Sequence, residues 1–282
     1  RTGFKLGAPV GFKDYMWEAL KDPAAGINMI QTAENLAKKY GITREDVDQF
    51  ASDSFAKAVA AQQAGFHAGE IVPVVTEKFE LEGYKARGIK LQGKVTEVST
   101  DTHPRISPVE VLAKLKPVYE GGVQTGGNSS ALVDAAAACV VTSGEYAKNL
   151  AKAQGKKPLA RVVAAAAVGV PPEIMGIGPA PAIRLLLERT GLTLDQIGRF
   201  EINEAQGAQT LAVGRELGLD LAKLNVNGGA IALGHPLAAT GVRLTITLAR
   251  QLQRSGLRYG ISSACVGGGQ GIALLIENPT GQ

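Results

Sequence analysis

The sequence predicts an α/β protein, and three features indicate that class. From residue 158 onward, strand-like and helix-like segments alternate, which is typical of βαβ units and favours a largely parallel sheet. The last two strand-like segments flank a short glycine turn, so we expect them to form an antiparallel hairpin. Residues 76–120, in contrast, are polar and interrupted by glycines, which indicates an irregular region in the first half.

The composition indicates a soluble globular chain with one large domain or two ordinary ones. Of its 282 residues, 45% are hydrophobic and 20% are charged, and the net charge of +4 is not clustered. We therefore expect no nucleic-acid partner, although an anionic small ligand would be favoured. The absence of a long apolar run or signal-peptide core predicts no membrane partner. Two cysteines do not suggest a disulfide framework, which favours a reducing, cytoplasmic location.

The first half begins with two helices whose ends are marked in the sequence. Residues 26–40 have helical character and stop before Gly41, a residue suited to the left-handed position at a helix C-terminus. Thr43 and Asp46 resemble a capping box for the second helix, which keeps its apolar spacing until Gly65. We therefore expect two consecutive helices.

Residues 70–75 are predicted to form a strand after these helices. His67 and His103 are interpreted as surface or packing residues, because no group of chemically active side chains accompanies either in the sequence. Further on, a charged, glycine-containing stretch at 148–157 is a candidate domain boundary.

The composition changes abruptly at residues 121–130, a loop of glycines and hydroxyl residues that leads into an alanine-rich run at 131–141. We interpret the run as a buried element, and its Cys139 as a core cysteine that burial makes unreactive. The Asn-Ser-Ser sequence at 128–130 is either a simple connection or a group able to hydrogen-bond an amide-bearing ligand.

The second half is predicted from apolar spacing and from glycines at helix ends. The expected strands are residues 159–170, 197–203, 259–265 and 272–277, and the expected helices are residues 181–190, ending at Gly191, and 204–217, ending at Gly218. A further helix is expected directly after Pro236, because leucines recur at i+4 from Leu244 to Leu252 and proline suits a first helical turn.

Three polar residues lie where predicted strand ends meet turns: Asn203, His235 and Cys265. Catalytic side chains of α/β sheets gather at the carboxyl ends of strands, so we expect these three around one pocket. At a helix N-terminus, the His235 imidazole can donate to an oxyanion or take a proton from a nucleophile; the alternative is a loop histidine that only caps or packs. Cys265 enters a glycine turn whose backbone N–H groups can bind an oxyanion.

Two other kinds of site are excluded by residue type. The segment from Gly229 to Gly234 has the outline of a phosphate-binding loop, but His235 and Pro236 stand where Lys and then Ser or Thr are required. A zinc site needs four ligands, and one suitable cysteine with one suitable histidine does not supply them. We therefore expect neither a nucleotide triphosphatase nor a metal site.

Three segments of the second half closely resemble the C-terminal signatures of the thiolases, the acetyl-CoA C-acyltransferases. They are Asn203-Glu204-Ala205, Gly228-Gly-Ala-Ile-Ala-Leu-Gly-His-Pro236 and Cys265-Val-Gly-Gly-Gly-Gln-Gly271. Three earlier segments resemble the family's middle segments and occur in the right order. They are Thr32-Ala-Glu-Asn35, Asp101-Thr-His-Pro-Arg105 and Gly127-Asn-Ser-Ser130.

The resemblance implies a thiolase-like α/β fold in three parts. Residues 1–128 would form a loop subdomain that covers CoA and takes part in oligomerisation. Residues 129–157 would be the C-terminal end of the N-terminal thiolase domain. Residues 158–282 would form the C-terminal domain, with the element order βαβαβαββ.

The resemblance also implies roles for four residues. His235 would activate the family's nucleophilic cysteine and help to bind the thioester oxygen, and Asn203 would hold the water that completes that oxyanion hole. Cys265 would exchange the α-proton of acetyl-CoA as an acid or base. The backbone N–H of Gly267 would contribute to a second oxyanion hole. A Claisen condensation needs such a base and two such pockets.

The substrates implied are acetyl-CoA and 3-ketoacyl-CoA, with Met29 and Ser130 against the pantetheine of CoA. The reaction would be thiolytic cleavage of 3-ketoacyl-CoA or Claisen condensation to acetoacetyl-CoA, in fatty acid metabolism. CoA thioesters enter as substrates, so no separate cofactor is expected. A homodimer or homotetramer is implied.

One part of the family pattern has no counterpart here, namely the nucleophilic cysteine of its N-terminal half. The resemblance therefore implies that the chain lacks the N-terminal part of a thiolase, and we expect it to be inactive by itself. Two alternatives stay open: a non-catalytic partner subunit that binds CoA or acyl groups, and a β-ketoacyl synthase-like condensing enzyme. Cys265 and the thiolase signatures argue against the latter.

Overall fold

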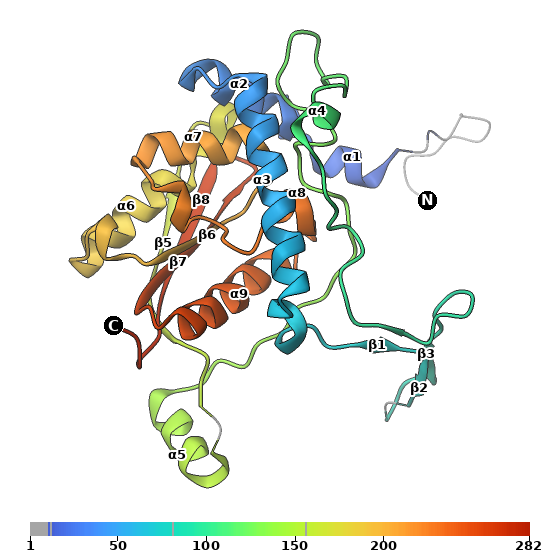
Figure 1. Cartoon of the computed structure of the whole chain (residues 1–282), viewed down its shortest axis with the longest axis vertical. Helices are drawn as coiled ribbons and strands as arrows, with labels where there is room; N and C mark the ends of the chain where they lie inside the picture. The colour runs from blue at the N-terminus through green and yellow to red at the C-terminus, as the bar shows by residue number, and fades with distance from the viewer. Residues whose placement is uncertain (1–10, 12, 81, 156) are drawn as a thin grey trace, which may run out of the picture.

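The computed structural model describes residues 11, 13–80, 82–155 and 157–282. At its centre lies a sheet with the strand order β5-β8-β7-β6, made of β5 (Arg161–Gly169), β6 (Arg199–Ile202), β7 (Tyr259–Val266) and β8 (Gln270–Glu277) (Figure 1). These are the four strands predicted for the second half. The predicted hairpin is also confirmed, because β7 and β8 pair antiparallel across the glycine turn.

The expectation of a largely parallel sheet is wrong. Only β6 and β7 pair in parallel, whereas β8 pairs antiparallel with both β5 and β7. The cause is the glycine turn after β7, which reverses the chain at once and inserts β8 between β5 and β7. As a result, β5, β6 and β7 run in one direction and β8 opposes them.

The additional strand of the implied βαβαβαββ order is reduced to one parallel bridge between Leu224 and Phe200. Asn225 follows with φ of 44°, a left-handed conformation that ends the extended chain. Its side chain continues the pairing instead: the Ile202 N–H donates to Oδ1 at 2.9 Å, and Nδ2 donates to the Ile202 carbonyl at 2.8 Å. An amide side chain thus replaces a strand at this edge of β6.

Two helices of the second half end at the predicted glycines, Gly191 and Gly218, and a third ends at Gly256, which was not predicted. α6 (Pro179–Thr190), α7 (Gly207–Leu217) and α9 (Thr240–Ser255) each stop at a glycine in the left-handed conformation. However, α9 does not begin directly after Pro236. The Pro236 carbonyl first accepts the N–H groups of Ala239 and Thr240, at 2.8 and 3.0 Å, in an intervening turn. His235 therefore lies before that turn and not at the helix N-terminus itself.

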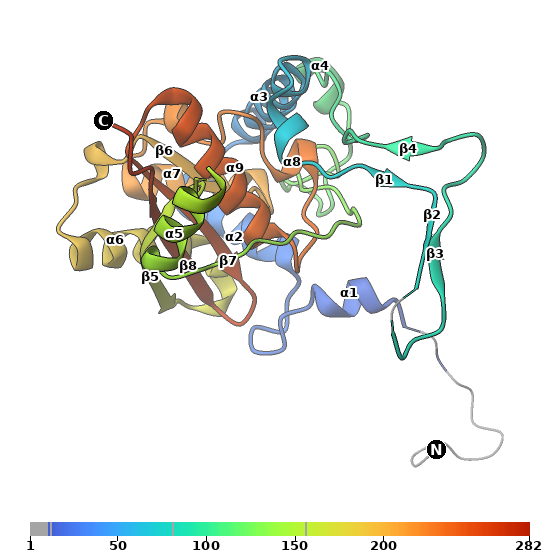
Figure 2. The same cartoon turned by 90° about the horizontal axis from the view of Figure 1, so that it is seen from below.

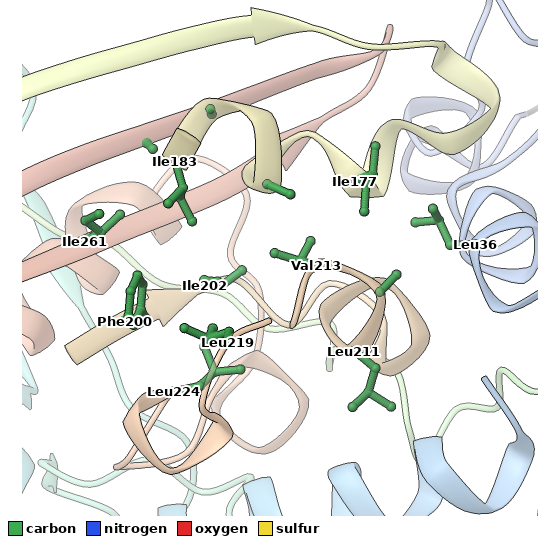
Figure 3. Packing of buried hydrophobic residues seen from close by; sticks show 14 of the residues in the cluster. Leu36, Ile177, Ile183, Phe200, Ile202, Leu211, Val213, Leu219, Leu224 and Ile261 are labelled. Carbon is green, nitrogen blue, oxygen red and sulfur yellow. The ribbon is translucent and has the colours of Figure 1, made fainter. Parts of the chain in front are cut away.

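The sheet is packed on both faces. Neighbouring residues of β8 point to opposite faces: Leu275 belongs to the apolar cluster that contains Ile183 of α6, and Ile276 belongs to the cluster that contains Leu248 of α9. Figure 3 shows part of the first cluster, in which Ile183, Phe200, Ile202 and Ile261 converge between α6 and the strands. α6 and α9 thus cover opposite faces of the sheet.

The two predicted N-terminal helices are confirmed as α2 (Met29–Tyr40) and α3 (Arg44–Gln63). Gly41 is left-handed, and Thr43 with Asp46 forms the capping box. Both helices pack directly on the second half of the chain. Leu36 and Val47 join the cluster that contains α7, and α3 shares a second cluster with α4 (Val109–Leu112) and α8 (Ala230–Leu233).

An arm, residues 72–80 and 82–100, projects from the body beyond α3 (Figure 2). Two antiparallel ladders form it, β1 (Val74–Val75) with β4 (Glu97–Val98) and β2 (Glu77–Phe79) with β3 (Arg87–Ile89). The predicted strand at 70–75 is therefore wrong over most of its length, because a short 3₁₀ helix, η1 (Phe66–Gly69), occupies the chain just before it. The remaining short helices are α1 (Tyr15–Ala19), η2 (Pro172–Ile177), η3 (Leu194–Gln196) and η4 (Leu221–Lys223).

The two histidines near this arm both contact other side chains. His67 is buried, and its Nδ1 lies 2.7 Å from Glu70 Oε1. The half-buried ring of His103 packs against Phe55 with 5.9 Å between ring centroids. The packing interpretation fits both residues, but His67 does have a charged neighbour that the sequence did not reveal.

The alanine-rich run at 131–141 is not a buried element, and that interpretation is wrong. The structure describes all of these residues and assigns them neither helix nor strand. Val140 is 90% exposed and Cys139 is also exposed, because the run pairs with no strand of the central sheet. The candidate boundary that follows is largely a helix, α5 (Gly144–Gln154), which buries none of its side chains. Among the described residues, no helix is both long and apolar enough to cross a bilayer.

We expect the stability of this fold to depend on the α6 face of the sheet. Replacing the fully buried Leu186 by Ala should lower the free energy of unfolding by about 2–5 kcal/mol, because the substitution removes buried methyl groups and leaves a cavity. The matched control is Leu159→Ala at a position 41% exposed, with an expected change below about 0.5 kcal/mol. Urea unfolding measures both, and equal losses would contradict the assignment of the core.

Candidate active site

Asn203 lies at the carboxyl end of the parallel strands β6 and β7. It is the first residue after β6, and its backbone N–H donates to the Ser263 carbonyl of β7 at 2.9 Å. Its side-chain Nδ2 lies 3.3 Å from His235 Nε2. The structure thus brings together two of the three residues expected in the site, at the strand end where catalytic groups of such sheets are found.

The hydrogen bonds of His235 define its neutral form. Its Nδ1 lies 2.7 Å from Thr240 Oγ1, and that hydroxyl donates its single proton to the Pro236 carbonyl at 3.1 Å. The hydroxyl must therefore accept a hydrogen bond from the histidine Nδ1–H. On the other side of the ring, Asn203 Nδ2 can only donate. Both contacts assign the proton to Nδ1 and leave Nε2 as the basic nitrogen.

Burial keeps His235 uncharged. Removal from water lowers the pKa of His235 to about 4, and the positive charge of Arg243 acts in the same direction. At neutral pH the ring is therefore neutral, with its Nε2 lone pair ready to accept a proton or a hydrogen bond.

Cys265 lies on the same edge of the sheet. In the register of β6 and β7, Ile202 is paired with Ser263, so Cys265 follows closely beyond the level of Asn203. Burial raises the pKa of the Cys265 thiol to about 12, and its own backbone N–H opposes the shift. The resting group is therefore a thiol. Within the described chain, no hydrogen bond joins Cys265 to His235.

The turn after Cys265 needs glycine at two positions. Gly268 and Gly269 have φ of 82° and 84°, and a Cβ on Gly269 would lie 2.1 Å from the Val170 carbonyl oxygen. At Gly267, an added Cβ would lie 3.7 Å from the terminal methyl of Met29, the first residue of α2. The expected CoA-binding Met29 therefore packs beside the expected oxyanion-hole residue Gly267.

Ser130 lies between the two loops that carry the other site residues. Its N–H donates to the Ala205 carbonyl at 3.1 Å, next to the Asn203 end of β6. The following Ala131 donates to the Ala230 carbonyl at 3.4 Å and accepts the His235 N–H at 3.1 Å. The segment is thus a backbone bridge between the Asn203 loop and the His235 loop.

Sequence reasoning missed the buried role of Glu204, which was expected at the start of a helix. Its Oε2 accepts hydrogen bonds from Ser54 Oγ at 2.6 Å and from the Ile231 N–H at 3.2 Å. Its Oε1 accepts from Asn225 Nδ2 at 2.8 Å. Burial raises the pKa of Glu204, while these donors oppose the shift. The only sequence signal was its place in the Asn203-Glu204-Ala205 motif.

Two more residues of the site were missed. Thr240 fixes His235, and Asp22 contacts the glycine turn, but a lone hydroxyl and a lone carboxylate carry no sequence signature of either contact. Across the described ranges, no three His, Cys, Asp or Glu side chains are grouped as metal ligands would be.

Comparisons with known proteins identify the family of this chain. The chain matches the thiolase N-terminal domain model over residues 1–145 and the thiolase C-terminal domain model over residues 156–278. The chain belongs to the thiolase family. It is 43% identical to an acetyl-CoA acetyltransferase of Syntrophomonas wolfei and 45% identical to one of Pseudomonas aeruginosa, with 98% of this thiolase chain and 67% of each relative covered.

Solved structures give the same result. The acetyl-CoA acetyltransferase of Bacillus anthracis matches with a TM-score of 0.84 at 44% identity, covering 98% of this chain and 66% of that one. Human mitochondrial 3-ketoacyl-CoA thiolase in complex with CoA matches with a TM-score of 0.84 at 39% identity, covering 99% and 66%. The expected thiolase fold is confirmed, and this thiolase chain spans about two thirds of the length of these relatives.

The three-part domain division stays a prediction. The N-terminal family model runs through residue 145 and the C-terminal model begins at 156, and neither marks a boundary near 128. The described structure shows α2 and α3 in one apolar cluster with the second half.

We expect His235 to make the stability of the chain depend on pH. Its folded pKa of about 4 lies below the value of 6.5 for an unfolded histidine, so the unfolded state binds the proton more readily. Its contribution is complete above pH 6.5 and is lost as the pH falls toward 4. Between pH 7.5 and pH 5, the wild-type chain should lose on the order of 2 kcal/mol more stability than His235→Gln. Urea unfolding at both pH values measures this difference, and equal losses would contradict it.

Thr240 should determine the tautomer of His235. In Thr240→Val the Nδ1–H loses its acceptor, so ¹⁵N NMR of the imidazole should show a mixture of tautomers, with a loss of about 1 kcal/mol in stability. Thr240→Ser keeps the hydroxyl and should retain the Nδ1–H form. An Nε2–H form in the wild-type chain would show that the assignment is wrong.

Proposed function

We propose that this chain carries the acid–base part of a thiolase site, which serves acyl transfer between CoA and acetyl-CoA. The observation that carries the proposal is the Asn203–His235 contact at the carboxyl end of β6 and β7, with Cys265 on the same edge. The reaction would be thiolytic cleavage of 3-ketoacyl-CoA, or its reverse, the Claisen condensation. The names of the relatives, acetyl-CoA acetyltransferase and 3-ketoacyl-CoA thiolase, support this substrate class.

His235 and Asn203 would act on the thioester side. The neutral ring has its basic Nε2 toward Asn203, so it can take the proton of a nucleophilic thiol and then donate that proton to an oxyanion. Asn203 Oδ1 is buried and has no hydrogen-bond partner within the described chain. A buried acceptor oxygen without a protein partner favours a bound water at that position, and this supports the water-holding role proposed for Asn203.

Cys265 would exchange the proton of the carbon that reacts. In thiolysis, a nucleophilic thiolate attacks C3 of 3-ketoacyl-CoA and the C2–C3 bond breaks. The electron pair passes to the acetyl-CoA enolate, and the Cys265 thiol supplies the proton to C2. In condensation, acylation of the nucleophile by one acetyl-CoA would release a CoA thiolate, which takes the proton of the Cys265 thiol. The Cys265 thiolate formed in this way would then remove the C2 proton of the second acetyl-CoA. The raised pKa of Cys265 supports this role, because a thiolate with a strongly bound proton is a strong base toward a weak carbon acid.

Neither cysteine of the chain suits the role of acyl-carrying nucleophile. Cys265 is assigned to proton transfer and cannot hold an acyl group at the same time. Cys139 was expected to be unreactive through burial, and that reason is wrong because it is exposed. It lies instead on a segment without helix or strand, outside every site contact described above.

The 282-residue chain should therefore not cleave acetoacetyl-CoA by itself, because covalent acyl transfer needs an activated thiolate. The same chain should gain turnover when it is fused behind the N-terminal segment of the Pseudomonas aeruginosa relative that it does not cover. In the fusion, Cys265→Ala should reduce turnover by about 10²–10⁴-fold.

Cys139→Ser is the matched control and should leave the turnover of the fusion unchanged. Thiolysis is followed by loss of acetoacetyl-CoA absorbance. Comparable turnover by the unfused chain would refute the proposal, because Cys139 or Cys265 would then have to act as the nucleophile.

The second candidate is a non-catalytic partner subunit that binds CoA or acyl groups. The lack of a cysteine in contact with His235 Nε2 among the described residues favours it. A chain that binds CoA, while its fusion stays inactive, would support this candidate. Assembly as a homodimer or homotetramer, a cytoplasmic location and a role in fatty acid metabolism stay predictions.

A further inference from the structure

A buried carboxylate links the N-terminal segment to the glycine turn after Cys265. Asp22 is only 1% exposed, and its Oδ2 accepts the Gly268 N–H at 2.6 Å. Its Oδ1 accepts the N–H groups of Ala24 and Ala25, at 2.8 and 3.1 Å. Three backbone donors therefore surround one carboxylate, and they lower the pKa of Asp22, the Gly268 bond most of all.

The loop that begins at Asp22 is closed on itself. The Asp22 N–H donates to the Ile27 carbonyl at 2.8 Å, and the Met29 N–H donates to the Leu20 carbonyl at 3.0 Å. Asn28 then caps α2 by accepting the Gln31 N–H at 3.0 Å. Because the loop is closed, any group that fixes Asp22 also fixes Met29 at the start of α2.

The glycine turn is held from two sides. The Val170 N–H donates to the Gly269 carbonyl at 2.7 Å, and Asp22 accepts the Gly268 N–H. The preceding Gly267 N–H has no hydrogen-bond partner within the described chain, and Met29 packs against this residue. Gly267 carries no side chain that could hold it in place, so the direction of its N–H depends on these two anchors at Gly268 and Gly269.

We propose that Asp22 is a positioning residue of the site: its carboxylate fixes the turn that carries the Gly267 N–H against the loop that carries Met29. The role rests on the proposed function, because Gly267 and Met29 are the groups assigned to the oxyanion and to the pantetheine of CoA. Asp22 is only 1% exposed, so its role is to hold the turn and not to touch substrate. One charge-assisted hydrogen bond would thus set the spacing of two groups that come from opposite ends of the chain.

The test compares Asp22→Ala and Asp22→Asn in the 282-residue chain. Asp14→Ala is the matched control, because Asp14 caps α1 by accepting the Met16 and Trp17 N–H groups and does not contact the glycine turn. Three quantities are measured: the exchange rate of the Gly268 amide by NMR, the Kd for CoA by calorimetry, and Tm.

In Asp22→Ala we expect the Gly268 amide to exchange at least tenfold faster and the affinity for CoA to fall about tenfold, because the charge-assisted bond to Gly268 is lost together with those to Ala24 and Ala25. Asp22→Asn keeps one acceptor oxygen but turns an NH₂ group toward either the Gly268 N–H or the Ala24 and Ala25 N–H groups, so both quantities should lie between those of the wild type and Asp22→Ala. Asp14→Ala should leave both unchanged at a comparable Tm.

Two results would overturn the role by different routes. If the wild-type chain binds CoA and Asp22→Ala binds it equally well, Asp22 is only structural and the proposed function is unaffected. If the wild-type chain does not bind CoA, the proposed function fails and the role of Asp22 fails with it.

Discussion

The side chain of Asn225 holds together the part of the fold on which the site depends. It pairs with both backbone groups of Ile202 as a strand would, and Nδ2 also donates to Glu204. The left-handed backbone of Asn225 then reverses the chain, with the Gly228 N–H donating back to the Asn225 carbonyl at 3.0 Å. The side-chain amide thereby completes the pairing of β6. The left-handed backbone of Asn225 turns the chain, so that the next segment returns toward Asn203. An apolar residue here would leave the polar edge of β6 buried without partners.

The carboxylate of Glu204 connects further elements to the same strand end. Its donors come from α3, from Asn225 and from the start of α8, so one carboxylate fixes three elements around the strand end. A Cβ on Gly229 would lie 2.1 Å from the Glu204 carboxyl carbon, which explains why the loop carries glycine there. The Asn203-Glu204-Ala205 motif therefore divides its tasks: the first side chain faces His235, the second anchors the surroundings, and the third residue's carbonyl holds Ser130.

Sequence patterns predicted helix ends and tight turns correctly, because neighbouring residues determine these features. Gly41, the capping box at Thr43 and the β7–β8 hairpin were predicted because caps and tight turns depend on neighbouring residues. Asn203 and His235 were predicted to meet because strand ends of a sheet share one edge. The position of β8 between β5 and β7, and the exposure of the run at 131–141, depend on distant pairing. Composition shows that such a segment is apolar, but it does not show whether another element covers it.

Burial acts on the two reactive groups in opposite directions and leaves both neutral. It lowers the pKa of His235 to about 4 and raises that of Cys265 to about 12. Both shifts therefore oppose the transfer of a proton from the Cys265 thiol to the His235 ring in the empty site. Cys265 and His235 therefore form no ion pair at rest, and under the proposed function charge first forms when His235 takes the proton of a nucleophilic thiol. Under the proposed function, the Nε2–H formed in this way can donate to the enolate oxygen, while the Cys265 thiol protonates the carbon. This separation suits an enzyme that must handle oxygen and carbon of one enolate at two different side chains.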